Sequence, residues 1–205
     1  MATIQKETVI IGAGPGGYVA AIRAAQLGQK VTIVEKEYIG GVCLNVGCIP
    51  SKALITAGHH FHNAQHSEVF GITTSNVKLD ITKMQNWKDT KVVSMLTRGV
   101  EGLLKKNKVE IIRGTAVFTD KNHLTVETKD GSQNLEFKNV VIATGSSPLT
   151  VSEVPFGGRV VDTTGGLNIT ELPKRLVIVG GGYVATQLAF AFNNFGSKVT
   201  ILEKE

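Results

Sequence analysis

Residues Gly12-Ala13-Gly14-Pro15-Gly16-Gly17 decide the fold, because Gly12, Gly14 and Gly17 have the G-x-G-x-x-G spacing of a dinucleotide-binding turn. Residues 8–11 before the turn, three of them apolar, predict a buried strand, and residues 14–27 predict the helix behind it. Residues 30–34 predict a second strand, which ends at Glu35. Such a turn lets backbone N–H groups approach a pyrophosphate, and an acidic residue at the position of Glu35 accepts hydrogen bonds from a ribose. A glycine turn without a nucleotide is the alternative, but the strand, helix and acidic residue together favour a nucleotide site.

The same pattern occurs a second time near the end of the chain. Residues 176–179 predict a strand, Gly180-Gly181-Gly182-Tyr183-Val184-Ala185 a turn into a helix, and residues 198–202 a strand that ends at Glu203. Gly180, Gly182 and Ala185 hold the three fingerprint positions of this copy. Two copies predict two nucleotide sites, and the carboxylate of Glu203 favours NAD over NADP because it opposes a 2′-phosphate.

The segment between the copies predicts further helices and a β-meander. Helices are expected from about Pro50 onward and over residues 81–106. Asp130-Gly131 is a turn signal between short strands. The expected strands cover residues 110–112, 116–119, 123–127, 134–137 and 140–143. We therefore expect an α/β protein with a parallel sheet and a meander, followed by the start of a second unit of the same kind.

Cys43 and Cys48 are the only cysteines, and they follow the first dinucleotide unit. A helix that begins near Pro50 places Cys48 at a helix N-terminus, which stabilises a thiolate. The alternative is a structural or metal-bound pair. Four intervening residues do not fit the usual two-residue zinc knuckle, and no second Cys or His pair follows at ligand spacing. A redox pair is the favoured interpretation.

Composition limits the remaining classes of function. The chain has 205 residues, 42% of them hydrophobic, which suffices for a buried core. We expect no membrane span, because the apolar runs are far shorter than the ~18 residues one needs. We expect no nucleic-acid partner, because the lysines behind the net charge of +5 are dispersed. His59, His62 and His66 share a helical face, but solvated imidazoles are favoured over a metal site because no carboxylate or cysteine completes the set.

Residues 40–54, Gly-Gly-Val-Cys-Leu-Asn-Val-Gly-Cys-Ile-Pro-Ser-Lys-Ala-Leu, resemble the redox-active segment of the dihydrolipoamide dehydrogenase family of flavin-dependent pyridine nucleotide-disulfide oxidoreductases. The similarity runs through the whole chain and includes Ala143-Thr144-Gly145-Ser146. Glutathione and mercuric reductases share the cysteine spacing. Together, Leu44, Ile49, Ser51 and Ala53-Leu54 resemble the lipoamide enzyme more closely.

The resemblance implies FAD in the first nucleotide site and NAD in the second. Cys43 would be the thiol that meets dihydrolipoamide, Cys48 the thiolate that faces the flavin, and Lys52 a neighbour of flavin nitrogen 5. The remaining residues implied for FAD are Glu35, Lys36, Gly41, Ala116, Thr144, Gly145 and Ser146. The implied reaction is oxidation of protein-bound dihydrolipoamide with reduction of NAD. The implied partners are lipoyl domains of 2-oxo acid dehydrogenase complexes and a second copy of the chain, in a bacterial cytoplasm.

The resemblance also implies domain limits, and the chain departs from the family pattern at one position. An FAD-binding domain with the redox disulfide would cover residues 1–147, a connection 148–172, and the first βαβ unit of an NAD domain 173–205. Family members are more than twice as long, so we expect this chain to be a piece that is inactive alone. Gln187 replaces the glutamate that usually pairs with the lysine matching Lys52. Another flavin disulfide reductase and a noncatalytic fragment that binds flavin or a partner are the alternative functions.

Overall fold

The computed structural model describes residues 3–204, which form two compact units. Unit 1 comprises residues 3–45 and 95–147, and unit 2 comprises residues 46–94 and 148–204. Each unit is therefore built from two separate stretches of chain. The domain limits expected from the sequence divide the chain differently and stay a prediction.

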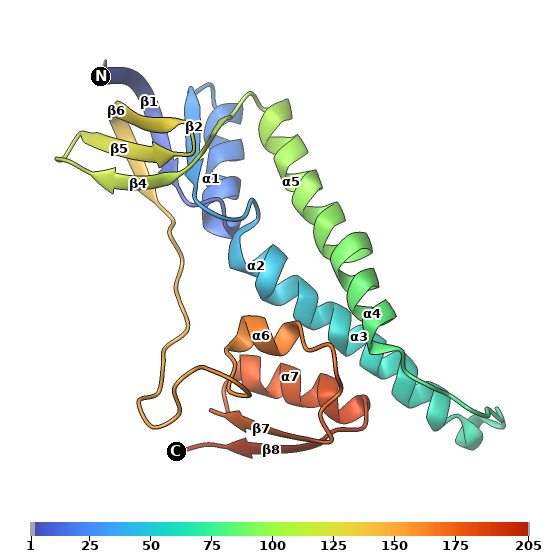
Figure 1. The fold of residues 1–205 in the computed structure, drawn as a ribbon. Coiled ribbons are helices and arrows are strands. Elements are labelled where there is room, and N and C mark those ends of the chain that lie inside the picture. Colours follow the sequence, from blue (N-terminus) through green and yellow to red (C-terminus); the bar gives the residue numbers. More distant parts are fainter. Residues whose placement is uncertain (1–2, 205) are drawn as a thin grey trace. The chain divides into compact units, whose positions relative to one another are not determined.

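Unit 1 is a six-stranded sheet with helices, and its strand order is β3-β2-β1-β6-β5-β4 (Figure 1). The first four strands in this order pair in parallel, and β6, β5 and β4 form the antiparallel meander. The strands are β1 (Thr3–Ile11), β2 (Val31–Glu35), β3 (Glu110–Arg113), β4 (Thr115–Phe118), β5 (His123–Thr128) and β6 (Gly131–Ile142). The helices are α1 (Pro15–Gln26) and α5 (Ser94–Lys106). This is the α/β, Rossmann-like arrangement with a meander that the sequence predicts.

The core of unit 1 lies where the parallel strands meet the meander. Val9 of β1 and Val34 of β2 are almost completely buried, and they pack in one cluster with Leu124, Val126 and Leu135 of the meander. The carboxyl half of β1 and the whole of β2 are buried, as expected for parallel strands that are covered on both faces. The carboxyl ends of these strands, where the nucleotide fingerprint lies, are thereby fixed in place.

Strand β6 corrects one expectation, because it runs unbroken from Gly131 to Ile142 where the sequence predicts two strands. The polar residues Lys138 and Asn139 lie between the two expected strands. In the structure Asn139 stays in the ladder opposite Thr8, and its amide donates to the Thr8 hydroxyl at 3.4 Å. A hydrogen-bonded polar partner on β1 therefore keeps the strand continuous.

Unit 2 contains the second βαβ copy and the helix that follows the cysteines. Strands β7 (Arg175–Val179) and β8 (Lys198–Leu202) pair in parallel, and α7 (Tyr183–Asn194) connects them. The other elements are α3 (Cys48–Gln65), the short 3₁₀ turn η1 (Glu68–Phe70), α4 (Ile81–Trp87), the π-helical turn η2 (Lys88–Val93) and α6 (Thr163–Leu167). Helix α2 (Gly41–Val46) precedes α3 and links the two units along the chain. The second copy thus has the element order that the sequence predicts.

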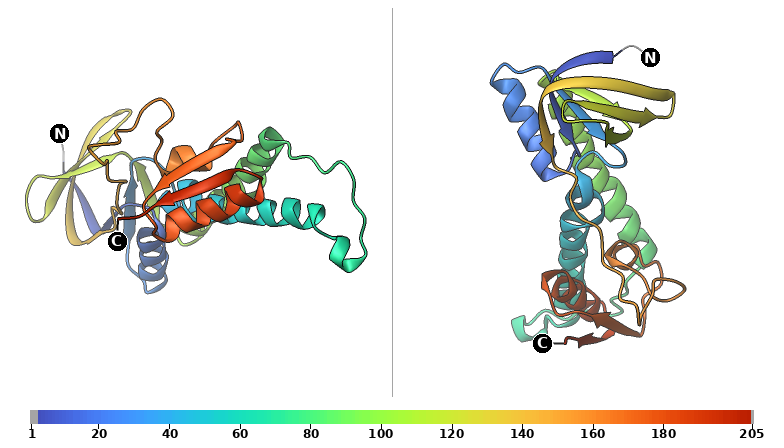
Figure 2. Two further views of the ribbon diagram at one scale, coloured as in Figure 1. Left: turned by 90° about the horizontal axis from the view of Figure 1, so that it is seen from below. Right: turned by 90° about the vertical axis from the view of Figure 1, so that its left-hand side faces the viewer.

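Helices α3 and α7 pack closely and form the core of unit 2 (Figures 1 and 2). Gly58 of α3 makes this approach possible, because a Cβ atom there would lie 3.2 Å from the carbonyl oxygen of Ala191. Leu54, Leu188 and Phe192 are buried in the same cluster. The helix that carries Cys48 is therefore held against the helix of the second dinucleotide unit.

The predicted helix over residues 81–106 forms, but with a π-helical turn that the sequence did not indicate. This turn carries Lys88, whose side chain is only 1% exposed. Its ammonium donates to the Leu167 carbonyl at 3.0 Å and to the Asn168 amide oxygen at 2.7 Å. The neighbouring Gln85 amide also donates to the Leu167 carbonyl, at 3.1 Å. Together these two side chains satisfy the carboxyl end of α6.

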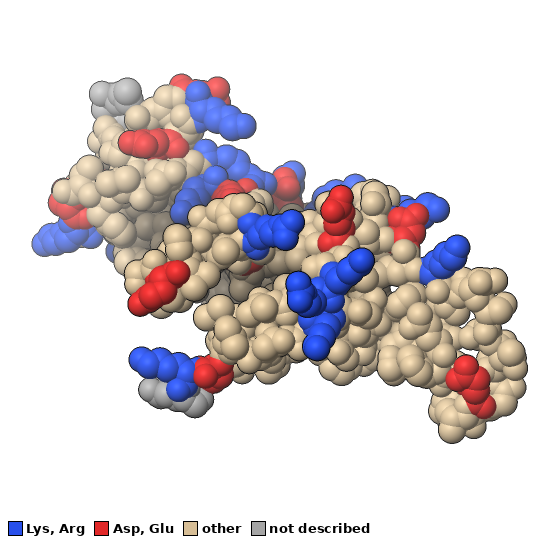
Figure 3. Space-filling view, turned by 60° about the horizontal axis from the view of Figure 1, so that its bottom comes forward, with Lys and Arg blue, Asp and Glu red and all other residues tan. Residues whose placement is uncertain are grey.

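One helical stretch in the described residues, Gly41–Gln65, is long and apolar enough to cross a membrane by length and composition alone. The short apolar runs in the sequence did not indicate it. In the structure 33% of its most apolar window is buried, and α3 packs on α7. A core helix passes the same test, so the finding is weak evidence for a membrane segment. On the face of the protein that Figure 3 shows, basic and acidic side chains are interspersed.

Candidate functional site

The first glycine turn lies between the end of β1 and the start of α1, and its backbone admits no side chain at two positions. Gly12 has φ +99°, and a Cβ atom there would lie 2.3 Å from the carbonyl oxygen of Ala143. A Cβ atom at Gly17 would lie 1.8 Å from the carbonyl oxygen of Gly12. Glycine is therefore required for the tight turn and for the close packing of α1 against it.

Gly14 and Gly41 bring the start of α2 against the start of α1. Gly41 has φ +59°, and a Cβ atom there would lie 2.5 Å from the Cα atom of Gly14. The N–H of Gly40 donates to the Ala13 carbonyl at 2.8 Å. No side chain caps the N-terminus of α1 at Gly14. The cysteine-bearing segment thus begins directly beside a helix N-terminus whose amides can receive an anion.

The Glu35 carboxylate closes the other side of this turn. It is 8% exposed and accepts from the N–H of Ala13 at 2.6 Å and from the N–H of Glu37 at 2.7 Å. The N–H of Tyr38 donates to the same carboxylate at 3.2 Å. A carboxylate has about four acceptor positions, so one remains for a ribose hydroxyl. The N–H of Gly114 donates to the Glu35 carbonyl at 3.0 Å, which starts β4 beside the end of β2.

The second dinucleotide unit repeats this geometry in its own backbone. Gly180 also has φ +99°, and its N–H donates to the Leu202 carbonyl at 2.7 Å, as Gly12 donates to Val34 at 2.8 Å. The N–H of Gly181 donates to the Glu203 carboxylate, as Ala13 does to Glu35. Gly182 is the N-cap of α7 and carries no side-chain cap. The two copies therefore share the hydrogen bond from the turn to the acidic residue as well as the sequence pattern.

The remaining residues that we expect to bind a nucleotide lie on several different elements. Thr144, Gly145 and Ser146 follow β6, and a Cβ atom at Gly12 would lie 3.3 Å from the Thr144 Cα atom. Ala116 lies on β4 and packs against the core cluster of unit 1. Lys36 is exposed directly after β2, and Ala185 lies in the first turn of α7.

The two cysteines lie on successive helices. Cys43 is half-buried within α2, and Cys48 is the first residue of α3 and exposed. No disulfide joins them in the structure. The expected helix start is confirmed, although it comes two residues before Pro50. Gly47, the N-cap of α3, supplies no side-chain cap, so the first amides of the helix face the Cys48 end without a competing side chain.

Lys52 lies one turn after Cys48 and is bound by Gln187 of α7. The Lys52 ammonium donates to the Gln187 amide oxygen at 3.1 Å. The Ser51 hydroxyl lies 3.2 Å from the same oxygen and donates to the Cys48 carbonyl at 2.9 Å. The neutral amide therefore still binds the lysine, and Ser51 extends the contact to the first turn of α3.

Sequence reasoning missed Asn45, which fixes the turn before Cys48. Its amide nitrogen donates to the carbonyls of Ile39 at 3.0 Å and Gly41 at 2.9 Å. Its oxygen accepts from the Thr97 hydroxyl at 3.2 Å. An asparagine between two cysteines is the only available signal, because its partners lie as far as 52 residues away in the sequence.

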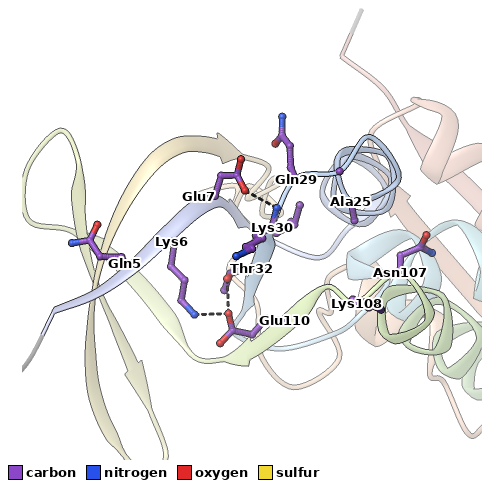
Figure 4. Close-up of a pocket in the computed structure, with 12 residues that line it drawn as sticks. Gln5, Lys6, Glu7, Ala25, Gln29, Lys30, Thr32, Asn107, Lys108 and Glu110 are labelled. Carbon is purple, nitrogen blue, oxygen red and sulfur yellow. Dashed lines mark hydrogen bonds and ion pairs between the residues drawn. The ribbon is translucent and has the colours of Figure 1, made fainter.

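A hollow of about 470 Å³ in unit 1 lies away from the glycine turn, where the parallel strands begin (Figure 4). The Glu110 carboxylate binds the Lys6 ammonium and accepts from the Thr32 hydroxyl at 2.6 Å. Burial alone would raise the pKa of Glu110, but these two partners hold it below its usual range. Glu7 accepts from the N–H of Lys30 at 2.8 Å. These charged groups bind one another, and we assign no ligand to this hollow.

The structure thus has two glycine turns that each bind an acidic residue, and Cys43 lies in the helix that begins beside the first turn. The family model for pyridine nucleotide-disulphide oxidoreductases matches residues 6–205. The chain belongs to this family.

Curated relatives narrow the comparison. The chain is 60% identical over 200 residues to dihydrolipoyl dehydrogenase of Geobacillus stearothermophilus, which covers 98% of this chain and 42% of that protein. The Staphylococcus aureus dihydrolipoyl dehydrogenase gives the same identity and coverage. The mitochondrial dihydrolipoyl dehydrogenase of Pisum sativum is 46% identical over 203 residues, with 97% and 40% covered. The chain therefore spans less than half the length of the curated relatives it matches.

Solved structures show the same fold. The HOCl-induced flavoprotein disulfide reductase RclA from Escherichia coli matches with a TM-score of 0.81 at 32% identity, covering 96% of this chain and 42% of that one. Its Cu(II) complex matches with a TM-score of 0.79 at 33% identity, covering 99% and 43%.

Proposed function

We propose that this chain supplies the flavin site and the redox dithiol of a dihydrolipoyl dehydrogenase. The observation that carries the proposal is the position of Cys43 and Cys48 on successive helices, with α2 starting against the glycine turn. The 60% identity to dihydrolipoyl dehydrogenases, against 32% to a disulfide reductase, supports the lipoamide substrate. The reaction is the oxidation of protein-bound dihydrolipoamide to lipoamide with reduction of NAD.

The residues of the first unit fit FAD. The uncapped amides at Gly14 suit a pyrophosphate, and the Glu35 carboxylate suits an adenosine ribose. Within this unit we assign the other flavin contacts to Gly12, Gly17, Lys36, Gly41, Ala116, Thr144, Gly145 and Ser146. The family resemblance adds Lys52, which belongs to the second unit. Bound there, FAD would supply the two-electron chemistry that connects the dithiol with NAD.

The second unit fits NAD by the same reasoning. Gly180, Gly182 and Ala185 would face the pyrophosphate, and Glu203 the ribose 2′-hydroxyl. The carboxylate of Glu203 opposes a 2′-phosphate, so the cofactor is NAD rather than NADP.

The cysteine pair performs thiol-disulfide exchange. A thiolate of dihydrolipoamide attacks the Cys43 sulfur of a Cys43–Cys48 disulfide, so that a substrate–Cys43 bond forms and Cys48 leaves as a thiolate. The second substrate thiolate then displaces Cys43 and closes the lipoamide ring. Two electrons are left on the cysteine pair, and the two substrate protons pass to a base. The N-terminus of α3 favours the negative charge on Cys48.

The proposal includes the setting of the enzyme. Its substrate is carried by lipoyl domains of 2-oxo acid dehydrogenase complexes, it acts as a homodimer, and it works in a bacterial cytoplasm. The bacterial dihydrolipoyl dehydrogenases among the relatives support this setting. The second candidate function is reduction of another disulfide, which the fold of RclA supports.

A chimera tests the function. The matching segment of the Geobacillus stearothermophilus enzyme is replaced by this chain, and NADH formation from dihydrolipoamide is measured. We expect turnover that is lost in Cys43→Ser and in Cys48→Ser, while FAD stays bound in both variants. Faster NAD(P)H-dependent reduction of glutathione disulfide than oxidation of dihydrolipoamide would favour the second candidate. The 205-residue chain alone, supplied with FAD, is expected to form no NADH.

A further inference from the structure

Helix α6 has little stability of its own. It has only five residues, and two of them, Gly165 and Gly166, are glycines. A helix this short is marginal in water, and glycine loses more backbone freedom on folding than any other residue. The helical form of α6 therefore depends on contacts that the rest of the chain provides.

The residues that flank α6 supply one side-chain hydrogen bond at each end. The Asp162 carboxylate accepts from the N–H of Gly165 at 2.8 Å, and the Asn168 amide donates to the Thr164 carbonyl at 2.9 Å. The Leu167 carbonyl lies at the carboxyl end of the helix, where carbonyl groups have no partner within the helix. Its two side-chain donors come from 79 and 82 positions earlier in the chain.

Lys88 is one of these donors, and it is a buried cation. Its ammonium has three protons, and three oxygen atoms surround it. These are the Leu167 carbonyl at 3.0 Å, the Asn168 amide oxygen at 2.7 Å and the Asp89 carboxylate at 3.1 Å. The Lys88 side chain is 1% exposed, and a buried ammonium is costly without such partners. Loss of α6 would remove two of the three acceptors, so α6 and Lys88 must open together.

Helix α6 lies against both α3 and α7 (Figure 1). A Cβ atom at Gly166 would lie 3.5 Å from a side-chain methyl group of Leu188 on α7. Leu167 is 3% exposed and packs in one cluster with Leu188 and with Leu54 of α3. The closed form of α6 therefore covers part of the apolar seam between these two helices.

We propose that α6 is a strap that opens and closes as a local unit over the seam between α3 and α7, and that Lys88 is the latch that holds it closed. The bonds to Lys88 and the burial of Leu167 favour the closed form. The two glycines and the desolvation of the ammonium oppose it. Such local units open without unfolding of the whole domain. The latch lies on the π-helical turn η2, an irregularity that is frequent at functional sites.

Hydrogen–deuterium exchange of the 205-residue chain, measured by mass spectrometry, tests the proposal with the amides of α7 as internal reference. Lys88→Met keeps an apolar chain in the core but removes the donor to Leu167 and Asn168. We expect the amides of residues 164–168 to exchange roughly tenfold faster or more, while those of α7 change by less than about twofold. Lys91→Met is the matched control, because Lys91 is exposed on the same turn and should leave the exchange unchanged.

Asn168→Ala is the second variant, and it keeps the test available if Lys88→Met does not fold. Asn168 is exposed, and its replacement removes one acceptor of Lys88 and the bond to Thr164, so exchange should again accelerate in α6 alone. Equal acceleration in α6 and α7 would show that no separate strap exists. Unchanged exchange of α6 in both variants, or the same acceleration by Lys91→Met, would overturn the latch. The measurement needs neither the thiols nor a bound nucleotide, so its outcome is independent of the proposed enzymatic function.

Discussion

The amide oxygen of Gln187 lies 3.1 Å from the Lys52 ammonium, so a side chain of the second dinucleotide helix binds the helix that begins at Cys48. A carboxylate in the same place would make this hydrogen bond charge-assisted. We predict that Gln187→Glu raises the free energy of unfolding by less than about 1 kcal/mol, because the pair is exposed. Denaturant unfolding measures the change.

Lys52→Met provides the control for this prediction in a double-mutant cycle. The gain from Gln187→Glu should disappear in the Lys52→Met background, because the new carboxylate then lacks its cation. A gain of the same size in both backgrounds would show that the carboxylate acts through something other than Lys52.

Glycines in two helices should respond to alanine with opposite signs. A Cβ atom at Gly58 would lie 3.2 Å from both the Ala191 oxygen and the Asn194 Cβ atom, so α3 and α7 must separate slightly. Gly99 lies in α5 with open space around it. We predict that Gly58→Ala lowers the free energy of unfolding by about 1 kcal/mol, whereas Gly99→Ala raises it by about 0.5–1 kcal/mol. Thermal unfolding of both variants measures this, and a stabilised Gly58→Ala would contradict the close packing.

Local sequence patterns predicted the parts of the fold in which residues interact within their own helix, strand or βαβ unit. Both glycine turns, their strands and helices, and the helix start near Cys48 follow from periodicity and glycine spacing. Glu35 and Glu203 were found because the acidic residue stands at a fixed distance after the turn. These features depend on neighbours within one βαβ unit, so the sequence contains the whole pattern.

Features that depend on distant partners could not be predicted in the same way. Lys88 has the sequence setting of a solvated residue, yet the π-helical turn directs it to the Leu167 carbonyl. Asn45 acts through Thr97, and Asn139 keeps β6 continuous through Thr8. In each case a polar side chain in one segment satisfies a polar group far away in the chain.

His123 lies between two carboxylates in the meander, which makes its protonation measurable. Its Nδ1 is 2.9 Å from Asp120, and its Nε2 is 3.4 Å from Glu136. The hydrogen bond to Asp120, more than Glu136, raises the pKa of His123 from its ordinary 6.5. Hydrogen bonds from the Asn122 N–H and from His123 lower the pKa of Asp120 from 3.8. We predict that Asp120→Asn lowers the His123 pKa in an NMR titration, and that Glu136→Gln lowers it less.

The raised pKa of His123 and the lowered pKa of Asp120 determine how the stability of the fold depends on pH. The raised His123 pKa gives stabilisation that is complete below 6.5 and lost as the pH rises through the folded-state value. The lowered Asp120 pKa gives stabilisation that is present above 3.8 and lost as the pH falls through the folded-state value. The pair should therefore stabilise the fold most between these two pH values. An Asp120→Asn penalty that is larger at pH above 8 than inside this window would contradict the assignment.

Asn45 should control how readily Cys43 reacts, because it holds the turn that leads into α2. Asn45→Ala removes hydrogen bonds to the Ile39 and Gly41 carbonyls, a loss of about 1–2 kcal/mol. The short helix should then open more often, and Cys43 within it is half-buried in the closed form. We predict faster alkylation of Cys43 by iodoacetamide, measured by mass spectrometry, with the exposed Cys48 as internal reference. Thr97→Val removes only the third bond of Asn45 and should accelerate the reaction less. Equal alkylation rates in Asn45→Ala and the unmodified chain would show that other contacts hold this turn.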